Sequence, residues 1–200
     1  LKAKLLLAIL SFVESNLKLV PDLEEMRRLL SSIVFVRFKK SERDDYISIL
    51  DKVICLTQDC HNAALLNTRL AAIGMKSSIV ENKDEQLALL NTLLDEIPEA
   101  TKSKRLRDKQ LVALLFKCEL VPVNEAMSIL ETAEKIYNEY SLEVDELLLL
   151  KVKAHIAEKT EDNNTGIRFA KECLAALPKY STKKCKFDIL KIVLSISKLS

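Results

Sequence analysis

Glycine and proline are almost missing from this chain, whose 200 residues include only 2 glycines and 4 prolines. Sheets and α/β folds need sharp turns at short intervals, and these two residue types make many of them. Apolar side chains recur instead at the three- and four-residue spacing of amphipathic helices. A phosphate-binding Gly-rich loop is excluded as well, because neither Gly74 nor Gly166 has a second glycine nearby. The sequence therefore predicts an all-α fold.

The predicted helices come in pairs. Two pairs end on Asp95-Glu96-Ile97-Pro98 and Ala175-Ala176-Leu177-Pro178, and the two prolines lie 80 residues apart. That interval holds two helix hairpins of about 40 residues, and such a hairpin cannot bury its apolar stripe without stacking on its neighbours. We therefore predict a right-handed α-solenoid of about five helix hairpins. Its repeat units are expected at 22–58, 61–98, 103–139 and 141–178 of a single domain over 1–200, with flanking helices at 2–16 and 182–199.

The repeat type is predicted from spacing and from a few motif positions. The last three units begin 42 and 38 residues apart, between the about 34 residues of a tetratricopeptide repeat and the about 40–47 of HEAT or armadillo repeats. Gly74 and Pro98 stand where a tetratricopeptide motif has its glycine and its terminal proline, whereas Ser77 and Gln86 replace its aromatic and small residues. The pattern favours a degenerate tetratricopeptide-like repeat.

Local features predict where several helices begin and end. Ser41, three residues before Asp44, predicts a capping box at the start of a helix. The β-branched tail Ile33–Val36 is assigned to a helix, the alternative being a strand that has no second strand to pair with. Residues 76–83 are polar enough to predict a loop, and the Asp- and Asn-rich stretch Thr160–Thr165 predicts another.

Cysteine use and the length of the apolar runs indicate a soluble, cytoplasmic chain. Five cysteines, an odd number at irregular spacing, are typical of reduced intracellular thiols. The largely apolar run Leu5–Val13 resembles a secretory leader, but no small-residue cleavage site follows it, so we assign it to a buried helix. The other apolar runs are far shorter than the about 20 residues of a membrane span. Because the chain begins with Leu1 and not with methionine, we expect a fragment of a longer protein.

No catalytic, cofactor or metal site is predicted. His61 and His155 are separated by most of the chain, and neither belongs to a recognisable catalytic motif. Cys55, Cys60 and His61 supply at most three zinc ligands and lack the second ligand pair of a structural site. We expect His61 to lie at a helix start and His155 to be exposed, and we expect a protein that is not an enzyme.

The remaining cysteines have two different expected environments. Cys118 and Cys173 stand at helical spacing with leucines and are expected to be small apolar core residues. Cys185 follows Lys183 and Lys184, which would lower a thiol pKa, so it is the cysteine to test for reactivity.

The densest charged feature is a basic cluster at a predicted helix start. Its bases are Lys102, Lys104, Arg105, Arg107 and Lys109, which oppose the helix dipole there. They are candidate contacts to phosphate or to an acidic partner. The alternative is a solvated helix start that the acids just upstream balance. The net charge of the whole chain is only +2, which is too weak to indicate a nucleic-acid-binding protein by itself.

The order of these features along the chain is similar to that in one known family. A helix pair, Leu23–Phe38 with Asp44–Leu56, leads into Asn62-Ala63-Ala64-Leu65-Leu66, and the basic stretch Lys104–Leu111 follows after a loop. From residue 24 to 178 this order resembles the tetratricopeptide-bearing large subunit of the eukaryotic signal recognition particle. The resemblance implies a ribonucleoprotein subunit in co-translational protein targeting that holds a second protein subunit on its concave face, with most RNA contacts made elsewhere.

We therefore expect a non-enzymatic protein-interaction scaffold within a larger cytosolic assembly. Its expected partner is another protein subunit on the concave face, with indirect or weak RNA contact, no cofactor, no small-molecule substrate and no membrane insertion. Two alternatives stay open. One is a helical-repeat module that binds RNA through the basic stretches, and the other is a helical-repeat adaptor of a different multisubunit complex.

Overall fold

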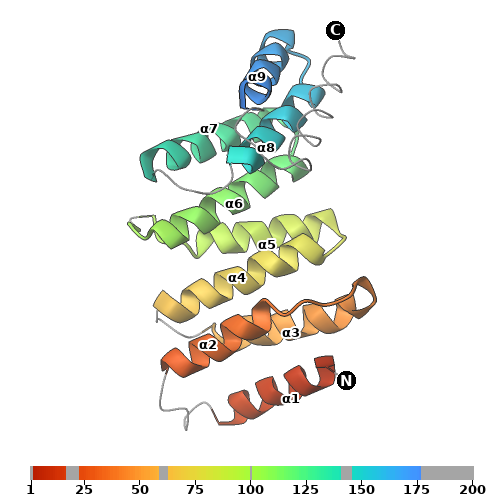
Figure 1. Ribbon diagram of the computed structural model, residues 1–200, viewed down its shortest axis with the longest axis vertical. Helices are drawn as coiled ribbons and strands as arrows, with labels where there is room; N and C mark the ends of the chain where they lie inside the picture. The colour runs from red at the N-terminus through yellow and green to blue at the C-terminus, as the bar shows by residue number, and fades with distance from the viewer. Residues whose placement is uncertain (1, 17–22, 59–62, 100, 141–145, 177–200) are drawn as a thin grey trace. The chain divides into compact units, whose positions relative to one another are not determined.

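The computed structural model describes residues 2–16, 23–58, 63–99, 101–140 and 146–176, and Figure 1 labels the helices within these ranges. Every regular element in them is helical and no strand occurs there, so the all-α prediction is confirmed. Contacts group the chain into two compact units, Leu1–Thr101 (unit 1) and Lys102–Ser200 (unit 2). The right-handed solenoid and the single domain stay predictions.

Unit 1 is a stack of helices that follow one another along the chain. Its described elements are α1 (Lys2–Ser15), α2 (Leu23–Val34), the 3-10 turn η2 (Lys40–Glu42), α3 (Arg43–Leu56), α4 (Ala63–Ile79) and α5 (Lys83–Asp95). Helix α2 packs against α3 and α4, α3 also packs against α1 and α4, and α4 packs against α5. Each helix therefore packs against the next helix in the sequence, against a helix of the neighbouring hairpin, or against both. This is the contact pattern of stacked helix hairpins.

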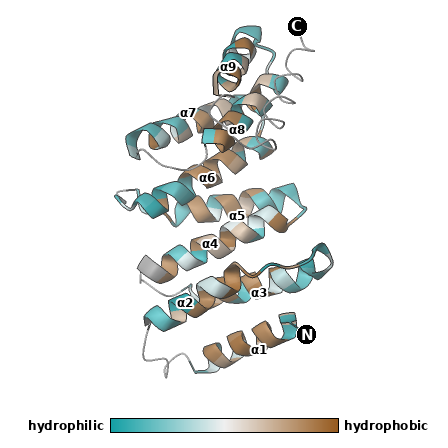
Figure 2. Ribbon diagram, in the orientation of Figure 1, coloured by the Kyte–Doolittle hydropathy of each residue, from teal (hydrophilic) through white to brown (hydrophobic). Residues whose placement is uncertain are grey.

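The core of unit 1 forms where the apolar stripes of these helices meet. Tyr46, Ile49, Leu50 and Val53 of α3 are buried, as their spacing predicts, whereas Ile54 is only partly buried. A fully buried leucine or isoleucine side chain contributes about 1.5–3 kcal/mol relative to an exposed one. In Figure 2 most helices carry both hydrophobic and hydrophilic residues, as expected for helices that bury only one side.

Unit 2 repeats this order of contacts. Its described helices are α6 (Lys104–Leu120), α7 (Val123–Tyr140), α8 (Glu146–Lys159) and α9 (Asn163–Ala176). Helix α6 packs against α7 and α8, α7 packs against α8, and α8 packs against α9. Leu111, Leu115, Leu130 and Ile156 are almost completely buried at its centre. The unit therefore has a core of its own.

The helix hairpins are regularly spaced along the chain. Helices α2, α4, α6 and α8, which open the four hairpins, begin at residues 23, 63, 104 and 146, so the intervals are 40, 41 and 42 residues. A constant interval of this length is typical of helical-repeat proteins.

Helix α4 is longer than predicted. Residues 76–79 continue it to Ile79, so the prediction of a loop over 76–83 is wrong for these four residues. The hydroxyls of Ser77 and Ser78 donate to the carbonyls of Gly74 and Met75 at 2.8 and 2.7 Å, which satisfies both side chains inside the helix. The connection to α5 is correspondingly short, and the Asn82 side chain caps α5 by accepting the Glu85 backbone N–H.

The connection from α2 to α3 also differs from the prediction. Helix α2 ends at Val34, so neither the predicted helix through Val36 nor the alternative strand forms there. The Tyr46 hydroxyl donates to the Val34 carbonyl, which gives a carbonyl at the helix end a partner from another helix. The predicted capping box of Ser41 is wrong as well. Helix α3 begins at Arg43 with no side-chain cap, and Glu42 instead accepts the Lys39 backbone N–H at 2.9 Å.

The loop before α9 is shorter than predicted, because α9 begins at Asn163 and not after Thr165. The Asp162 carboxylate accepts the backbone N–H groups of Asn164 and Thr165 at 3.1 and 3.3 Å. These bonds cap the helix. The hydrogen bond from the Thr165 hydroxyl, together with these backbone bonds, lowers the pKa of Asp162. The predicted helix over 182–199 and residues Cys60, His61 and Cys185 lie outside the described residues.

Candidate functional site

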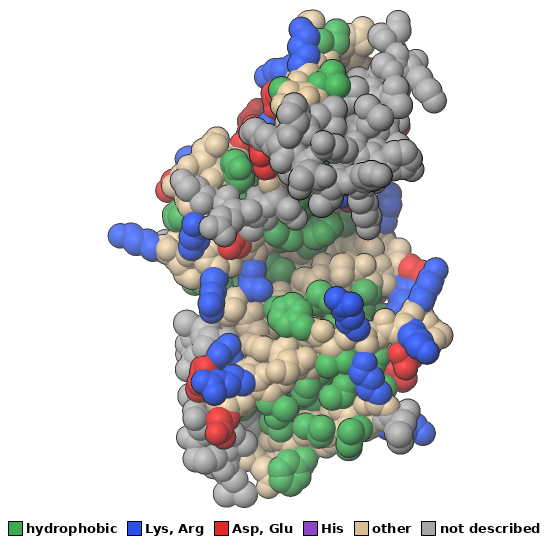
Figure 3. Space-filling model, in the orientation of Figure 1, with side chains coloured by type: hydrophobic (Ala, Val, Ile, Leu, Met, Phe, Trp, Pro, Cys, Tyr) green, Lys and Arg blue, Asp and Glu red, His purple; other side chains and the backbone are tan. Residues whose placement is uncertain are grey.

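A groove of ≈ 730 Å³ with a mixed apolar and charged lining lies in unit 1 at the connection between α2 and α3. The connection forms one wall, and the start of α3 and the end of α4 form the others. We call it the loop groove. Its lining residues are Phe35, Val36, Arg37, Phe38, Lys39, Lys40, Arg43, Tyr46, Met75, Ile79 and Glu81. Figure 3 shows hydrophobic side chains gathered over α1 to α4 on the visible face, with Lys and Arg side chains at their border.

Stacked side chains hold the floor of the groove. The rings of Phe38 and Tyr46 are 4.6 Å apart and nearly parallel. The Lys2 ammonium lies 4.7 Å from the centroid of Phe38 and also donates to the carbonyl of Arg37. Tyr46 is buried, and this burial raises the pKa of its hydroxyl. The connection is therefore fixed in place by contacts with α1 and α3.

Phe35 is the aromatic residue of the groove that faces solvent most. Its side chain is 63% exposed, which is unusual for phenylalanine and places an apolar ring at the rim. Met75 and Ile79 of α4, both partly buried, continue the apolar lining. An exposed ring beside partly buried apolar side chains is a typical anchor point in protein interfaces.

The charged part of the groove is strongly basic. Arg37, Lys39 and Lys40 are exposed, and the half-buried Arg43 forms an ion pair with Glu81. The lining thus carries four cations and a single carboxylate. The Nε atom of Arg43 is buried and has no hydrogen-bond partner among the described residues. A buried donor without a partner is costly, so an acceptor that reached it would be stabilised.

The predicted basic cluster contains both exposed and partly buried residues in the structure. Lys102, Lys104 and Arg105 are exposed in unit 2. Arg107 donates to Gln110 at 2.6 Å and is partly buried. Lys109 is partly buried too, and desolvation lowers its pKa. Three of the five predicted contact residues therefore reach freely into solvent.

A second ionic site in unit 2 is internal. The buried Lys153 of α8 pairs with Glu134 of α7 at 2.6 Å and with Glu172 of α9, beside a pocket of ≈ 430 Å³. Burial works against the ammonium, but the hydrogen bonds that it donates to both carboxylates outweigh burial and raise the pKa of Lys153. Because these ion pairs join α7, α8 and α9, we assign Lys153 a structural role.

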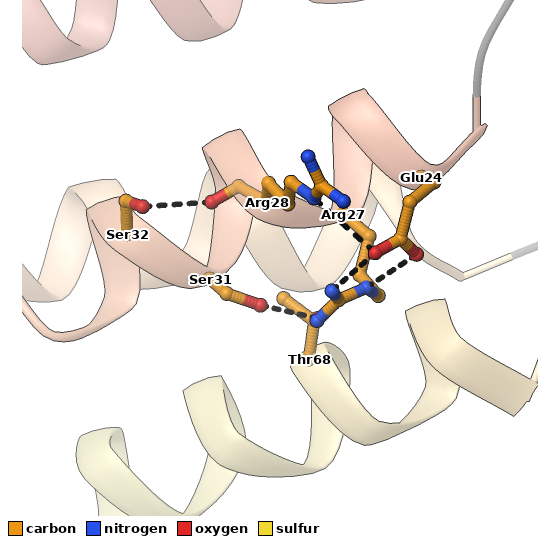
Figure 4. A network of polar contacts seen from close by, with 6 residues as sticks. All are labelled: Glu24, Arg27, Arg28, Ser31, Ser32 and Thr68. Carbon is orange, nitrogen blue, oxygen red and sulfur yellow. Dashed lines mark hydrogen bonds and ion pairs between the residues drawn. The ribbon is translucent and has the colours of Figure 1, made fainter.

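Polar side chains also join α2 to α4 in unit 1 (Figure 4). The hydroxyls of Ser31 and Thr68 are 2.9 Å apart across the two helices. On the exposed side of α2, Glu24 pairs with Arg27 and Arg28, and the hydrogen bond from Arg27 lowers the pKa of Glu24 to about 2. Exposed pairs of this kind contribute little to stability, so we assign this network no functional role.

The histidine and cysteine predictions have mixed outcomes. Cys118 and Cys173 are buried, as predicted, and burial raises their thiol pKa to about 12 and about 11. His155 is half-buried and not exposed as predicted. Among the described residues no group of His, Cys, Asp and Glu side chains could hold a metal ion. Nor does any described helix combine the length and apolar character needed to cross a bilayer.

The loop groove was not predicted from the sequence. Its signal was present in Phe35-Val36-Arg37-Phe38-Lys39-Lys40, where apolar and basic residues are interleaved. That segment was considered only as a helix end or a strand. Comparison with protein-family models, with curated proteins and with solved structures gave no match to this chain.

Proposed function

We propose that this chain is a non-enzymatic protein-interaction module, and that the loop groove is where it holds a segment of its partner. The observation that carries the proposal is the 63% exposed ring of Phe35 at the rim of a groove that other side chains keep open and basic. Interface cores are rich in aromatic residues, methionine and arginine, and the groove contains all three. Such a surface binds a partner without needing any reacting group.

Stacked helix hairpins suit this role. Stacked hairpins form the core with their neighbours, so the connections between helices are left to vary and to bind. We further propose that the hairpins are tetratricopeptide-like and form a right-handed solenoid with its partner on the concave face. The place of Gly74 in the hairpin α4–α5 supports the repeat type, because a tetratricopeptide motif has glycine at that position.

The assembly in which the module works is proposed from the resemblance alone. The order of helix pairs and basic stretches makes the cytosolic signal recognition particle the first assembly to test. An adaptor of another multisubunit complex is the same function in a different setting.

Direct RNA binding is the second candidate, and the exposed bases Lys102, Lys104 and Arg105 favour it. Such binding would depend steeply on salt, because phosphate contacts release counterions. The partial burial of Arg107 and Lys109 reduces the basic surface available for it. Protein interaction through the loop groove therefore ranks first.

The test is a quantitative pull-down from cell extract with two charge-reversed variants that have the same change in net charge. The loop reversal is Arg37→Glu, Lys39→Glu and Lys40→Glu. The cluster reversal is Lys102→Glu, Lys104→Glu and Arg105→Glu. All six side chains are exposed, so both variants should keep the fold, which circular dichroism and thermal melting would check.

The expected result is a partner protein that the loop reversal loses and that the cluster reversal keeps. Signal recognition particle proteins among the lost partners would support the specific assembly. A partner lost only with the cluster reversal, or RNA lost in that way, would replace the proposal with the second candidate. Partners that are unaffected by either reversal would contradict both.

A further inference from the structure

We propose that the occupant of the loop groove is an acidic peptide segment that carries one large apolar side chain. This inference rests on the proposed function and adds the chemistry of the partner. The juxtaposition that carries it is an exposed aromatic ring, an apolar lining from α4 and four cations around one volume of ≈ 730 Å³.

Charge complementarity selects an acidic partner. Four of the lining side chains are cationic, and the only acidic one, Glu81, is already paired with Arg43. Arg37, Lys39 and Lys40 are exposed and are free to pair with carboxylates of another chain. Complementary charge of this kind speeds association with acidic segments and disfavours basic ones.

The apolar lining selects a large apolar side chain. Val36, Met75 and Ile79 are partly buried, and Phe35 stands exposed beside them. Methionine adapts its shape to different apolar groups, and one anchoring side chain in a pocket commonly supplies much of the affinity of a peptide. A volume of ≈ 730 Å³ accommodates such a side chain together with its neighbours.

A single-stranded nucleic acid fits the same groove less well. Base recognition uses aromatic faces on which bases can stack. One face of Phe38 is stacked on Tyr46 and the Lys2 ammonium lies over the ring as well, while Tyr46 is itself buried. Of the aromatic rings in the groove, only that of Phe35 is largely open to solvent. The aliphatic lining offers no face on which a base could stack.

Glu81 already occupies the carboxylate position beside Arg43. Its side chain is 79% exposed, so it is held mainly by that ion pair. A carboxylate of the partner must therefore compete with Glu81 for the Arg43 guanidinium. Removing the charge of Glu81 should strengthen binding, whereas removing the charge of Arg43 should weaken it. Both changes break the same ion pair, so a purely structural role would move binding in the same direction in both.

The experiment measures fluorescence polarisation with the full chain and defined probes. The main probe is a labelled peptide of about 12 residues with one central phenylalanine flanked by Asp and Glu. Its controls are the same peptide with Asn and Gln in place of the acids, the acidic peptide with serine in place of phenylalanine, and a labelled oligouridylate. The protein variants are Glu81→Gln, Arg43→Gln, Phe35→Ser and the loop reversal, with the cluster reversal as the matched control.

We expect the acidic phenylalanine peptide to bind at least about tenfold more tightly than either peptide control, with affinity falling as salt rises. Glu81→Gln should raise the affinity by about threefold, and Arg43→Gln, Phe35→Ser and the loop reversal should each lower it by a similar factor or more. The cluster reversal should leave it unchanged.

Equal affinity for the neutral peptide would overturn the acidic partner while leaving the protein-interaction function standing. Tighter binding of oligouridylate that the loop reversal abolishes would overturn it in favour of a nucleic acid. Parallel effects of Glu81→Gln and Arg43→Gln would also overturn it. A chain that self-associates through this groove, seen as a dimer that the loop reversal dissociates on a sizing column, would identify a second copy as the occupant instead.

Discussion

The Arg107 guanidinium lies over the ring of Tyr140, 5.1 Å from its centroid, and so joins the first turns of α6 to the last residue of α7. In the sequence Arg107 is one of five bases that look alike, but in the structure it is a packing residue of unit 2. A cation above an aromatic face contributes about 0.5–2 kcal/mol, depending on how far it is removed from water.

Charge reversal should therefore change the stability of the chain differently at Arg107 than at the exposed residues of the basic cluster. Arg107→Glu is expected to destabilise the chain by about 1–2 kcal/mol, because it replaces the contact with Tyr140 and the hydrogen bond to Gln110 by a carboxylate. The double variant Lys104→Glu, Arg105→Glu should have an unchanged or slightly raised stability, since acidic side chains interact favourably with the helix dipole at the start of a helix. Chemical denaturation measures both. Equal stability of the two variants would show that Arg107 is as free as its neighbours.

The core of unit 2 gives a second prediction. Leu115 of α6 has no exposed surface, and Leu115→Ala should cost about 2–5 kcal/mol, the range for large-to-small changes in a core. Leu114→Ala and Leu149→Ala should also be clearly destabilising, because both side chains are buried as the helical spacing predicts. Phe116→Ala, at a side chain 40% exposed, is the matched control and should cost far less. A Phe116 variant that melts below the Leu115 variant would reverse the assigned faces of α6.

Much of the fold could be predicted from the sequence because the relevant signals are local. The stripe of α3 follows from residue spacing, and the buried thiols Cys118 and Cys173 follow from their apolar neighbours. Helix ends were less predictable. Ser77 and Ser78 look like loop residues, but α4 continues through them and their hydroxyls bond back to carbonyls of the preceding turn.

The loop groove could not be predicted in the same way, because its parts are distant in the sequence. The interleaved segment around Phe35 was visible, but the groove also needs Met75, Ile79 and Glu81 from the end of α4. Ile79 and Glu81 belong to the stretch that was predicted as a loop, and Met75 directly precedes it. A wrong helix end therefore concealed the second wall of the site.

The buried ammonium of Lys153 gives a third prediction. Lys153→Met should keep the packing of the stem but leave Glu134 and Glu172 without their shared partner, which costs about 1–3 kcal/mol. Because the folded-state pKa of Lys153 is raised above its ordinary value of 10.5, its contribution is fully present below that pH. The contribution is lost as pH rises through the folded-state pKa.

The measurement is the difference in unfolding free energy between the wild type and Lys153→Met at several pH values. The difference should be constant from neutral pH to about pH 9 and should shrink above about pH 10.5. Lys171→Met, at an exposed position of α9, is the control and should show almost no difference. A difference that grows in alkaline solution would contradict the assigned ion pairs.

The two glycines give a fourth prediction. A Cβ atom at Gly74 would lie 3.5 Å from the Leu93 side chain, and one at Gly166 would lie 3.5 Å from the Ala157 carbonyl oxygen, both ordinary contact distances. Alanine also favours helix over glycine by up to about 1 kcal/mol. Gly74→Ala and Gly166→Ala should each leave the melting temperature unchanged or raise it. A marked fall in either variant would mean that the helices approach more closely than the structure places them.

The most direct measurement of the central claim is hydrogen exchange of the chain with and without the acidic phenylalanine peptide. Binding of the peptide should slow exchange in the segments 35–43 and 75–81, which contain most of the residues that line the loop groove, and should leave residues 102–109 unchanged. The Phe35→Ser variant should lose this protection at the same peptide concentration. Protection confined to residues 102–109, or unchanged exchange at the groove under conditions where the peptide is bound, would contradict peptide binding in the loop groove.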